Sequence, residues 1–532
     1  MDSMSASNQD TPSSSSSNFS PTSQANNYSS SKSNSASNDT LFSPPSSLLI
    51  VGSGVFGLST ALALTRRPEF SACSITVIDR SDAASGVFPA PDAASVDTSR
   101  IIRADYADSA YAALGAQAQL QWRNKSKPTD LGAQGRYTES GLLLVADGAT
   151  PSPNTPPTPP AKLDKTKLTG MDYARLSWAN VLSLASQNPD LARHIRELPD
   201  TTSIRDAART GGGSSGTWGY INEGSGWADA GASMAWLYEQ VKQTERVTFV
   251  AGTVISLERD GDRITGAALS DGRSLSADLV MLAAGAWTAS LLDISTQAVA
   301  TGQVLGYLDI TQEEQDQLNN MPVILNLTSG LFIIPPRDRV LKIARHAYGY
   351  LNPTPLSVAP LPLSPSTATS NQRPSLPRTS LSDPILTIPA DDEADLRACL
   401  REMIPIPAIW DRRFSKTRLC WYSDTPTGDF VVDYHPEWKG LFVTFGDSGH
   451  AFKFLPVLGD KVVDCITKRR PTEFEGKWDW KPVSSSTAPF LVTEDGSRGG
   501  KVGMVLADEL AKITEGEQDK VSTSTPTRHR IE

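Results

Sequence analysis

The stretch Leu48-Leu-Ile-Val-Gly-Ser-Gly-Val-Phe-Gly57 decides the fold of this chain. Its first four residues are apolar and predict a short buried strand. The glycines that follow have the spacing Gly52-x-Gly54-x-x-Gly57, and an apolar pattern typical of a helix begins directly after them. A strand, a glycine turn and a helix in this order are typical of a dinucleotide-binding unit.

Each glycine has a physical task in such a unit. Gly52 permits the tight turn, Gly54 lets the backbone approach a pyrophosphate, and Gly57 lets helix and strand pack closely. The helix that starts near Val55 and Phe56 offers free N–H groups and the positive end of its dipole to phosphates. The turn alone does not distinguish NAD from FAD.

A second buried strand, 75–79, ends in an acid at the expected distance from the glycines. Asp79 is expected to accept hydrogen bonds from a ribose, and Arg80 directly after it is expected beside the same cofactor. The residues around the turn therefore predict a complete nucleotide-binding site.

Composition limits the class of protein. The chain has 532 residues, a formal net charge of −10 and no long basic block, which argues against a nucleic-acid partner. Its four cysteines are widely spaced, which suits a reducing compartment, and no His/Cys cluster has metal-ligand spacing. No secretory signal, membrane-spanning stretch or Ser-Lys-Leu ending is visible. We therefore expect a soluble, intracellular, cytoplasmic protein without a metal, with a peroxisomal location as the alternative.

Three regions have the composition of irregular chain. Residues 1–46 are rich in Ser and Asn, and residues 483–532 in Ser, Thr, Gly and charge, so we expect both ends to be disordered tails. Residues 353–388 are rich in Pro and Ser and predict an inserted loop, and 149–161 predict a surface loop.

The rest of the chain predicts an α/β fold. Buried strands separated by helices indicate a Rossmann-type nucleotide domain built from discontinuous segments, and alternating strands indicate a mostly antiparallel α+β substrate domain. The nucleotide domain is expected from 47–105, 226–300 and 415–482, and the substrate domain from 106–225 and 301–414.

Individual elements follow from hydrophobic period and turn signals. Helices are expected at 107–122 and at 226–241, the latter with a cap at Asp229, and Asp260-Gly261 predicts a hairpin. Strands are expected at 137–146, 247–257, 263–269, 430–432 and 441–445. Residues 277–288 are expected to form a buried strand that ends in a small-residue turn and enters a helix. Another alternating segment surrounds 331–344, and residues 504–514 form at most a short helix.

The section from Arg418 to Pro456 carries most of the remaining chemistry. A turn Gly446-Asp-Ser-Gly-His-Ala-Phe-Lys453 follows a strand and opens a helix. A glycine turn at a helix N-terminus beside a lysine is a natural place for an anion or an electron-rich ring.

The sequence here resembles the flavin-dependent oxidases of the monomeric sarcosine oxidase type in the DAO superfamily, close to the fungal fructosyl-amino-acid oxidases and the saccharopine/pipecolate oxidases. The motifs occur in family order and cover most of residues 47–480, without the tails or 353–388. They are the glycine turn, Ser99-Arg-Ile-Ile-Arg103 with Asp105-Tyr106, Gly226-Trp227, Ala283-Ala-Gly-Ala-Trp-Thr288, Cys420-x-Tyr-x-Asp-Thr-Pro426 and Ser448-Gly-His-x-Phe-Lys453.

The resemblance implies FAD as the cofactor and makes Cys420 the expected covalent attachment point, the alternative being a small buried hydrophobe. A thioether would prevent cofactor loss and change the potential of the ring. The residues expected to bind the cofactor are Gly52, Gly54, Val55, Phe56, Gly57, Asp79, Arg80, Ser99, Arg100, Val254, Gly285, Cys420, Gly449, His450, Phe452 and Lys453.

The resemblance also implies four catalytic residues. Arg100 lies over the flavin, and Arg103 and Lys453 bind the substrate carboxylate, for which the planar fork of arginine is suited. Arg100 and Arg103 would share one face if their segment were helical. Lys342 matches a lysine held near the flavin and would stabilise superoxide; alternation places Leu341 and Ile343 on the opposite side, which also suits a surface lysine.

The function expected from this set is an FAD-dependent oxidase of a secondary amino acid that reduces O₂ to H₂O₂. The alternatives are a flavin dehydrogenase with another acceptor, a tailoring oxidase of a biosynthetic N-methyl amino acid, and a flavin-fold protein without turnover. The expected partners are a small amino acid and O₂, and we expect a monomer. One departure is Ala451, which stands where relatives usually carry glycine beside the flavin.

Overall fold

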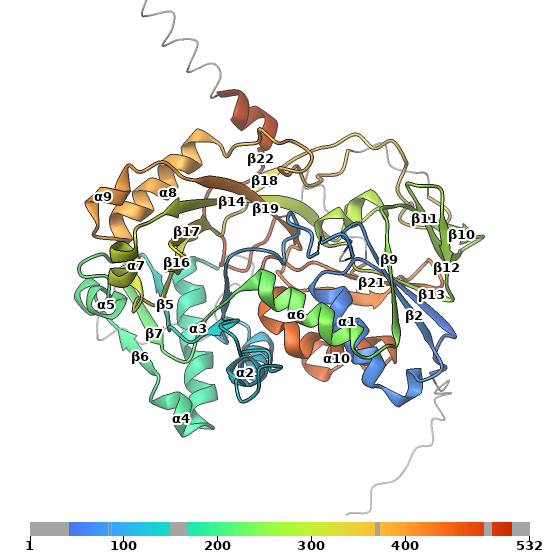
Figure 1. Cartoon of the computed structure of the whole chain (residues 1–532), viewed down its shortest axis with the longest axis horizontal. Coiled ribbons are helices and arrows are strands. Elements are labelled where there is room, and N and C mark those ends of the chain that lie inside the picture. Colours follow the sequence, from blue (N-terminus) through green and yellow to red (C-terminus); the bar gives the residue numbers. More distant parts are fainter. Residues whose placement is uncertain are drawn as a thin grey trace, which may run out of the picture. The chain divides into compact units, whose positions relative to one another are not determined.

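The computed structural model describes residues 42–82, 84–86, 88–148, 168–367, 373–482 and 492–512 (Figure 1). The predictions for 1–41, for the loop at 149–161 and for the rest of the C-terminal tail lie outside these residues. Among the helices that are described, none is long and apolar enough to cross a membrane.

The glycine turn follows the first strand of a largely parallel sheet with the order β20-β21-β13-β1-β2-β9. All neighbours in this sheet are parallel except β20, which runs antiparallel to β21. The predicted strands on either side of the turn are confirmed. The bounds are β1 Ser47–Val51, β2 Ser74–Asp79, β9 Val247–Ala251, β13 Leu279–Leu282, β20 Val431–Tyr434 and β21 Leu441–Phe445. Strands from three separated stretches of the chain thus share one sheet.

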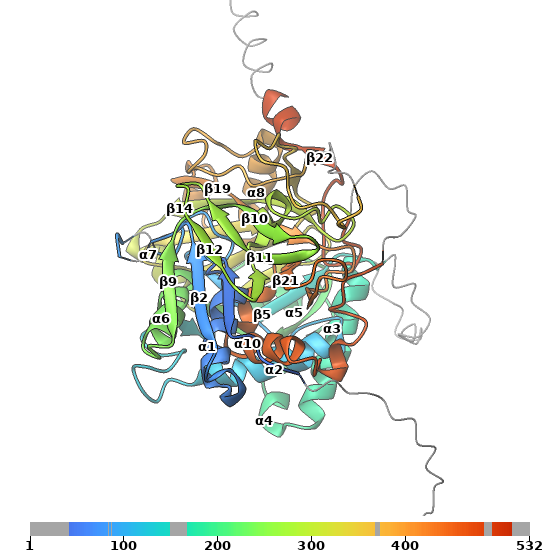
Figure 2. The same cartoon turned by 90° about the vertical axis from the view of Figure 1, so that its right-hand side faces the viewer.

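Helices α1 Val55–Arg66, α6 Ala230–Lys242 and α10 Leu455–Ile466 lie together beside this sheet (Figure 2). Close approach depends on glycine, since a Cβ on Gly57 would lie 1.9 Å from the Gly52 carbonyl oxygen and a Cβ on Gly459 1.9 Å from that of Ser59. The Asp229 side chain caps α6 as predicted, by accepting a hydrogen bond from the Ala232 amide.

Two of the predicted elements near α6 are wrong in part. Residues 226–228 form strand β8 rather than the first turn of the helix, because they pair with β3 and β4. The expected strand 247–257 is two strands in different sheets, since the chain turns at Gly252 after β9. The hairpin at Asp260-Gly261 is confirmed within a sheet of β10 Val254–Asp260, β11 Arg263–Leu269 and β12 Ser274–Ser276.

A second large sheet is mostly antiparallel and has the order β22-β18-β14-β17-β16-β15-β5-β7-β6, with β19 also paired to β14. Its strands are β5 Leu142–Ala146, β6 Ile195–Leu198, β7 Trp218–Asn222, β14 Val299–Asp309, β15 Val323–Asn326, β16 Leu331–Arg337, β17 Val340–Arg345, β18 Tyr350–Leu351, β19 Lys416–Asp424 and β22 Met504–Val505. A small sheet joins β3 Arg100–Ile102, β8 Gly226–Ala228 and β4 Tyr137–Thr138. The predicted strand 137–146 is therefore two strands, β4 and β5, in different sheets.

Further helices are α2 Ser109–Arg123, α3 Gly170–Ser186, α4 Pro189–Ala192, α5 Thr201–Ala208, α7 Gln312–Leu318, α8 Ala390–Met403 and α9 Pro407–Trp410. Short 3₁₀ turns occur at Pro68–Phe70, Gly285–Ser290, Ala451–Phe454 and Thr472–Phe474. The described residues of the 353–388 insert contain no helix or strand, which agrees with the predicted loop.

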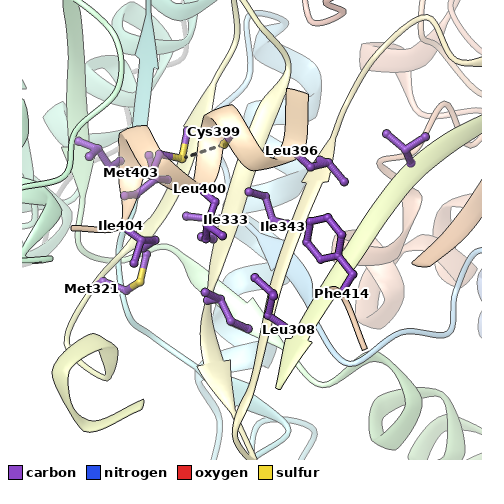
Figure 3. Close-up of a cluster of buried hydrophobic side chains, with 14 of the residues drawn as sticks. Leu308, Met321, Ile333, Ile343, Leu396, Cys399, Leu400, Met403, Ile404 and Phe414 are labelled. Carbon is purple, nitrogen blue, oxygen red and sulfur yellow. Dashed lines mark hydrogen bonds between the residues drawn. The ribbon is translucent and has the colours of Figure 1, made fainter. Parts of the chain in front are cut away.

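Helix α8 covers one face of the antiparallel sheet with a buried apolar cluster (Figure 3). Leu400 and Met403 of the helix lie over Ile333 and Ile343 of β16 and β17. Because side chains alternate along a strand, Lys342 lies on the opposite face of β17, where it is 2% exposed. The predicted alternation is confirmed, and the alternative of a surface lysine is wrong.

The boundaries expected from composition need two corrections. Strand β19 pairs with β14 along its whole length, so it belongs to the antiparallel sheet and not to the nucleotide domain. Residues 492–512 are not a disordered tail, because β22 pairs with β18, residues 506–512 are helical and Leu506 is fully buried.

The segment from Arg100 to Arg103 is not helical, so the two arginines do not share one face of a helix. Arg100 lies in strand β3, where residues three apart point to opposite sides. The two guanidinium groups accordingly have different surroundings, which are described below.

Candidate active site

A cavity of about 310 Å³ lies at the carboxyl ends of β1, β2 and β13. This edge is where open α/β sheets bind their ligands. Of the predicted cofactor residues, those that line it are Gly52, Gly54, Val55, Phe56, Asp79, Arg80, Arg100, Val254, Gly285, Gly449 and Phe452. One cavity thus joins the glycine turn to residues that are hundreds of positions away in the chain.

The glycine turn forms one end of this cavity. Gly52 has a φ of +109°, and its amide donates to the Ile78 carbonyl oxygen at 2.8 Å, which closes the turn against β2. Gly54 precedes α1 without any side-chain cap, and a Cβ built on it would meet nothing within 4 Å. The first N–H groups of α1 therefore face open space, as a pyrophosphate site requires.

Asp79 and Arg80 lie at the end of β2 beside the turn. The Asp79 carboxylate accepts hydrogen bonds from the Ser53 amide at 2.7 Å and from the Ser81 amide at 2.8 Å. Its predicted ribose contact remains a prediction. The Arg80 guanidinium forms an ion pair with Asp92 at 2.6 Å and lies 4.2 Å from the ring centroid of Trp287.

The other end of the cavity lies beside Arg100. The Cys420 thiol, 2% exposed, accepts a hydrogen bond from Arg100 Nη2 at 3.3 Å. Gly449 has a φ of +70°, and a Cβ on it would lie 2.3 Å from the ring of Tyr422, so this turn requires glycine. Ala451 lies in the cavity wall at the start of the next 3₁₀ turn.

A buried carboxylate, Asp97, connects Arg100 to the antiparallel sheet. It accepts hydrogen bonds from Arg100, from Lys342 Nζ at 2.6 Å and from the Tyr307 hydroxyl at 2.7 Å. Burial opposes ionisation of Asp97, but Lys342 and Arg100 hold the pKa of this carboxyl well below its ordinary value. Burial lowers the pKa of Lys342 to about 8 against the attraction of Asp97. The Lys342 ammonium also donates to the Ser99 carbonyl oxygen at 2.7 Å.

Two other buried cations have no acidic partner among the described residues. Arg103 is 7% exposed, and its Nη1 is buried without any hydrogen-bond partner, while its Cζ lies 4.5 Å from the ring centroid of Tyr106. Lys453 Nζ donates only to the His450 carbonyl oxygen at 3.0 Å. Burial, and then repulsion from Arg103 and Arg100, holds the pKa of Lys453 well below its ordinary value.

The structure brings most of the predicted residues into one site, although several do not line the cavity itself. Gly57 packs under the turn, Ser99 and Lys342 meet behind Arg100, and His450 bonds to Tyr106 and Gly428. The wall residues that sequence reasoning missed include Tyr422, Asp447, Trp287, Ala93 and Ala94. Asp447 stood inside a quoted motif, and burial raises its pKa to about 6.

Two further residues that were not predicted lie near Arg103 and Lys453. Arg498 is 6% exposed, pairs with Asp424 at 2.5 Å and donates to the Ser448 carbonyl oxygen at 3.0 Å. It also donates to His346 Nδ1 at 3.1 Å, and burial holds the pKa of His346 well below its ordinary value. The chain order gives no signal for either contact, since Arg498 comes from the segment assigned to the tail.

Comparison with known proteins identifies the family. The family model for FAD dependent oxidoreductases (DAO) matches residues 47–465. The chain belongs to this family. The resemblance inferred from the motifs is thereby confirmed, and FAD is the cofactor on which the activity of the family depends.

Curated relatives match this chain over most of its length and of their own. The amino acid oxidase imqH of Aspergillus flavus is 33% identical, with 79% of this chain and 93% of the relative covered. The amino acid oxidase fsqB of Aspergillus fumigatus is 32% identical, with coverage of 80% and 93%. L-saccharopine oxidase of Schizosaccharomyces pombe is 27% identical, with coverage of 82% and 93%.

Solved structures show the same fold. Amadoriase I of Aspergillus fumigatus, a fructosyl amine oxidoreductase, is 25% identical with a TM-score of 0.66, covering 87% of this chain and 96% of its own. Amadoriase II, a fructosamine oxidase of the same fungus, is 26% identical with a TM-score of 0.65, covering 87% and 95%. The mixed α/β fold expected from the sequence is confirmed.

The residues of the cavity fit FAD on the geometry of this chain. Uncapped helix N–H groups suit its phosphates, and the glycines of two turns leave room for the backbone to approach the cofactor. Within the described ranges, no three His, Cys, Asp or Glu side chains are placed to hold a metal ion.

The two glycines of the turn should respond differently to alanine. Gly54→Ala adds a methyl group only to open cavity space, so the apoprotein should fold normally but bind FAD at least ~10-fold more weakly. Gly57→Ala forces a methyl group to 1.9 Å from the Gly52 carbonyl oxygen and should lower the melting temperature of the apoprotein itself. Flavin content and apoprotein melting, measured for both variants, check this. Normal FAD affinity in Gly54→Ala would contradict the assignment of the turn to the pyrophosphate.

Proposed function

We propose that this FAD-dependent oxidoreductase oxidises the C–N bond of a secondary, N-substituted amino acid to an imine. In the same turnover O₂ is reduced to H₂O₂, so that the two electrons and two protons lost by the amine are accounted for. The bound flavin supplies the two-electron acceptor. The observation that carries the proposal is the buried Arg103 Nη1 without a partner.

A buried cation without a counter-ion is unfavourable unless a ligand supplies the charge. Arg103 lies close enough to Lys453 that, after burial, its charge is the next cause that holds the pKa of Lys453 well below its ordinary value. A substrate carboxylate would neutralise both and accept the free N–H of Arg103 in a charge-assisted hydrogen bond. The site therefore selects amino acids over simple amines.

The chain contributes orientation rather than a strong base. Asp97 is occupied by Arg100 and Lys342, and Asp105 accepts hydrogen bonds from Asn222 at 3.0 Å and Ser225 at 2.7 Å. Neither carboxylate is available to take a proton from the substrate. Fixing the carboxylate holds the adjacent C–H in one position, and this positional restraint lowers the entropic part of the barrier.

The names of the relatives support the substrate class. They include amino acid oxidases, an L-saccharopine oxidase, sarcosine oxidases and an N-methyl-L-tryptophan oxidase. The N-methyl-L-tryptophan oxidase among them supports a tailoring oxidase of an N-methyl amino acid as the second candidate.

Two further roles belong to this proposal. Cys420 is the proposed attachment point of a covalent flavin, supported by its place beside Arg100, since cysteines next to cations are the reactive ones. Lys342 is the proposed cation that favours reduction of O₂, supported by its burial and its charged partner Asp97.

The proposal is tested by an H₂O₂-release screen across saccharopine, pipecolate, fructosyl-lysine, sarcosine and N-methyl aromatic amino acids. Arg103→Met should lower kcat/KM for the preferred substrate by about 100-fold, because a buried charge-assisted hydrogen bond is lost. Arg175→Met is the matched control, since Arg175 also has a buried Nη2 without a partner but lies over Trp218. The methyl ester of the substrate should not distinguish Arg103→Met from the unaltered protein.

The outcomes of this screen are separable. Full activity of Arg103→Met on the free acid would sink the carboxylate assignment. Rapid flavin reduction by substrate with no H₂O₂ would favour a dehydrogenase with another acceptor.

Lys342 gives a prediction about pH. A lysine with its pKa lowered to about 8 is charged below that pH and neutral above it. The rate constant for reaction of the reduced protein with O₂ should therefore fall as pH rises through about 8. Stopped-flow measurement on Lys342→Met should show a slower rate without this step, and Arg100 remains to pair with Asp97 in that variant. A flat profile in the unaltered protein would remove Lys342 from the oxygen reaction.

A further inference from the structure

The insert 353–388 lies outside the motifs of the family, yet parts of it are buried in the cofactor domain. In Figure 1 its described residues, 353–367 and 373–388, lie as irregular chain between β18 and the hairpin of β10 and β11. Leu361, Ser375 and Thr379 are 8%, 9% and 5% exposed. An irregular loop with buried polar side chains is held by specific contacts, and these contacts show what it does.

The first contact reaches one wall of the FAD cavity. Thr379 Oγ1 donates to Asp92 Oδ2 at 3.0 Å, and Asp92 Oδ1 accepts from Arg80 Nη2 at 2.6 Å. Asp92 precedes Ala93 and Ala94, which line the cavity, as does Arg80 itself. The insert therefore holds the Asp92 carboxylate through Thr379, and Asp92 in turn holds Arg80 in an ion pair.

The second contact reaches the opposite wall. The Leu361 amide donates to the Leu291 carbonyl oxygen at 2.9 Å, and the Leu361 carbonyl oxygen accepts from the Asp293 amide at 2.8 Å. Leu291 lines the cavity and follows the 3₁₀ turn that carries Trp287. One insert thus holds both walls.

The two walls meet where the guanidinium of Arg80 lies 4.2 Å from the ring centroid of Trp287. Arg80 directly follows Asp79, and both Arg80 and Trp287 line the cavity, so this contact joins the two walls beside the glycine turn.

We propose that the described parts of the insert, 353–367 and 373–388, act as a clasp that slows the release of FAD, with Thr379 and Asp92 as positioning residues for Arg80. Movement of either wall would separate Arg80 from Trp287 and open this side of the cavity. The backbone of the first wall is held farther along, where Arg418 donates to the Ala93 and Val96 carbonyl oxygens at 2.8 and 2.6 Å. Asp92 lies before this anchored stretch, and the Thr379 hydrogen bond ties it to the insert.

The physical basis is the charge of Asp92. A buried carboxylate oxygen that loses its donor is left without compensation, so the closed arrangement of Arg80 loses support. The Thr379 hydroxyl also accepts a weak hydrogen bond from the Leu381 amide at 3.3 Å, which lies inside the insert. A serine at this position keeps both bonds and a valine keeps neither.

The proposal rests on FAD binding, which the family shows, and not on the amino-acid substrate. The test measures release of FAD from the full-length holoprotein in a Cys420→Ser background, so that a thioether cannot retain the flavin. Dissociation is followed by the rise in flavin fluorescence after the holoprotein is diluted to a concentration at which released FAD does not rebind. Thr379→Val should release FAD roughly 10-fold faster than the background protein, and Thr379→Ser should behave as the background does.

The matched control is Ser375→Ala. Ser375 Oγ donates to the Ala300 carbonyl oxygen at 2.6 Å, so this variant also removes a buried hydroxyl of the insert, but one bound to β14 instead of the cavity wall. It should release FAD within about twofold of the background rate. The melting temperature of the apoprotein should fall no more in Thr379→Val than in Ser375→Ala.

Equal release rates for Thr379→Val and Ser375→Ala would overturn the clasp, and so would a loss in Thr379→Val that is fully explained by apoprotein melting. Neither outcome touches the proposed oxidase activity, which is measured separately by H₂O₂ release. A chain that oxidises no secondary amino acid but shows the predicted release rates would retain the clasp and lose the proposed function.

Discussion

The site depends on the hydrogen bonds that the buried carboxylate of Asp97 accepts. It accepts hydrogen bonds from Arg100 of β3, Lys342 of β17 and Tyr307 of β14, and so ties the segment beside the cofactor to the antiparallel sheet. Two buried cations would repel each other without it. Asp97 therefore allows Arg100 to stand at the cavity wall, beside Cys420, and Lys342 to lie behind it with a lowered pKa.

One carboxylate, that of Asp97, compensates the two cations Arg100 and Lys342. Among the described residues, Arg103 and Lys453 have no carboxylate partner. The neighbourhood of the cofactor is thus positively charged although the whole chain carries −10. An FAD-dependent oxidoreductase gains from this arrangement twice. Under the proposed function, these groups attract and orient a substrate carboxylate, and they stabilise negative charge that develops during reduction of the cofactor or of O₂. Arg100, Lys342, Arg103 and Lys453 do not determine which substrate side chain is accepted. That specificity depends on other contacts.

How much the sequence could predict depends on the range of the interaction. The turn from Gly52 to Gly57, the cap at Asp229 and the hairpin at Gly261 are local, and all three are confirmed. The alternation around Lys342 placed its side chain opposite Leu341 and Ile343, but predicted neither its burial nor its partner Asp97, which lies 245 positions away. Strand pairing is also non-local. The pattern of residues 247–257 therefore predicted one strand, although the two halves pair in different sheets. The ordered segment 492–512 has the composition of a tail. Its order was not predictable from that composition, because it depends on contacts of Arg498 and Leu506 with residues distant in the chain.

The central claim is that Arg103 and Lys453 await a carboxylate beside the cofactor. The most direct measurement is titration of the purified flavoprotein with methoxyacetate, an analogue with an ether in place of the amine, followed by the flavin absorption spectrum across pH. Because Lys453 is charged only below its lowered pKa, affinity should fall as pH rises through that pKa, and Arg103→Met should abolish the spectral change. Binding of equal strength in Arg103→Met, or an affinity independent of pH, would contradict the account.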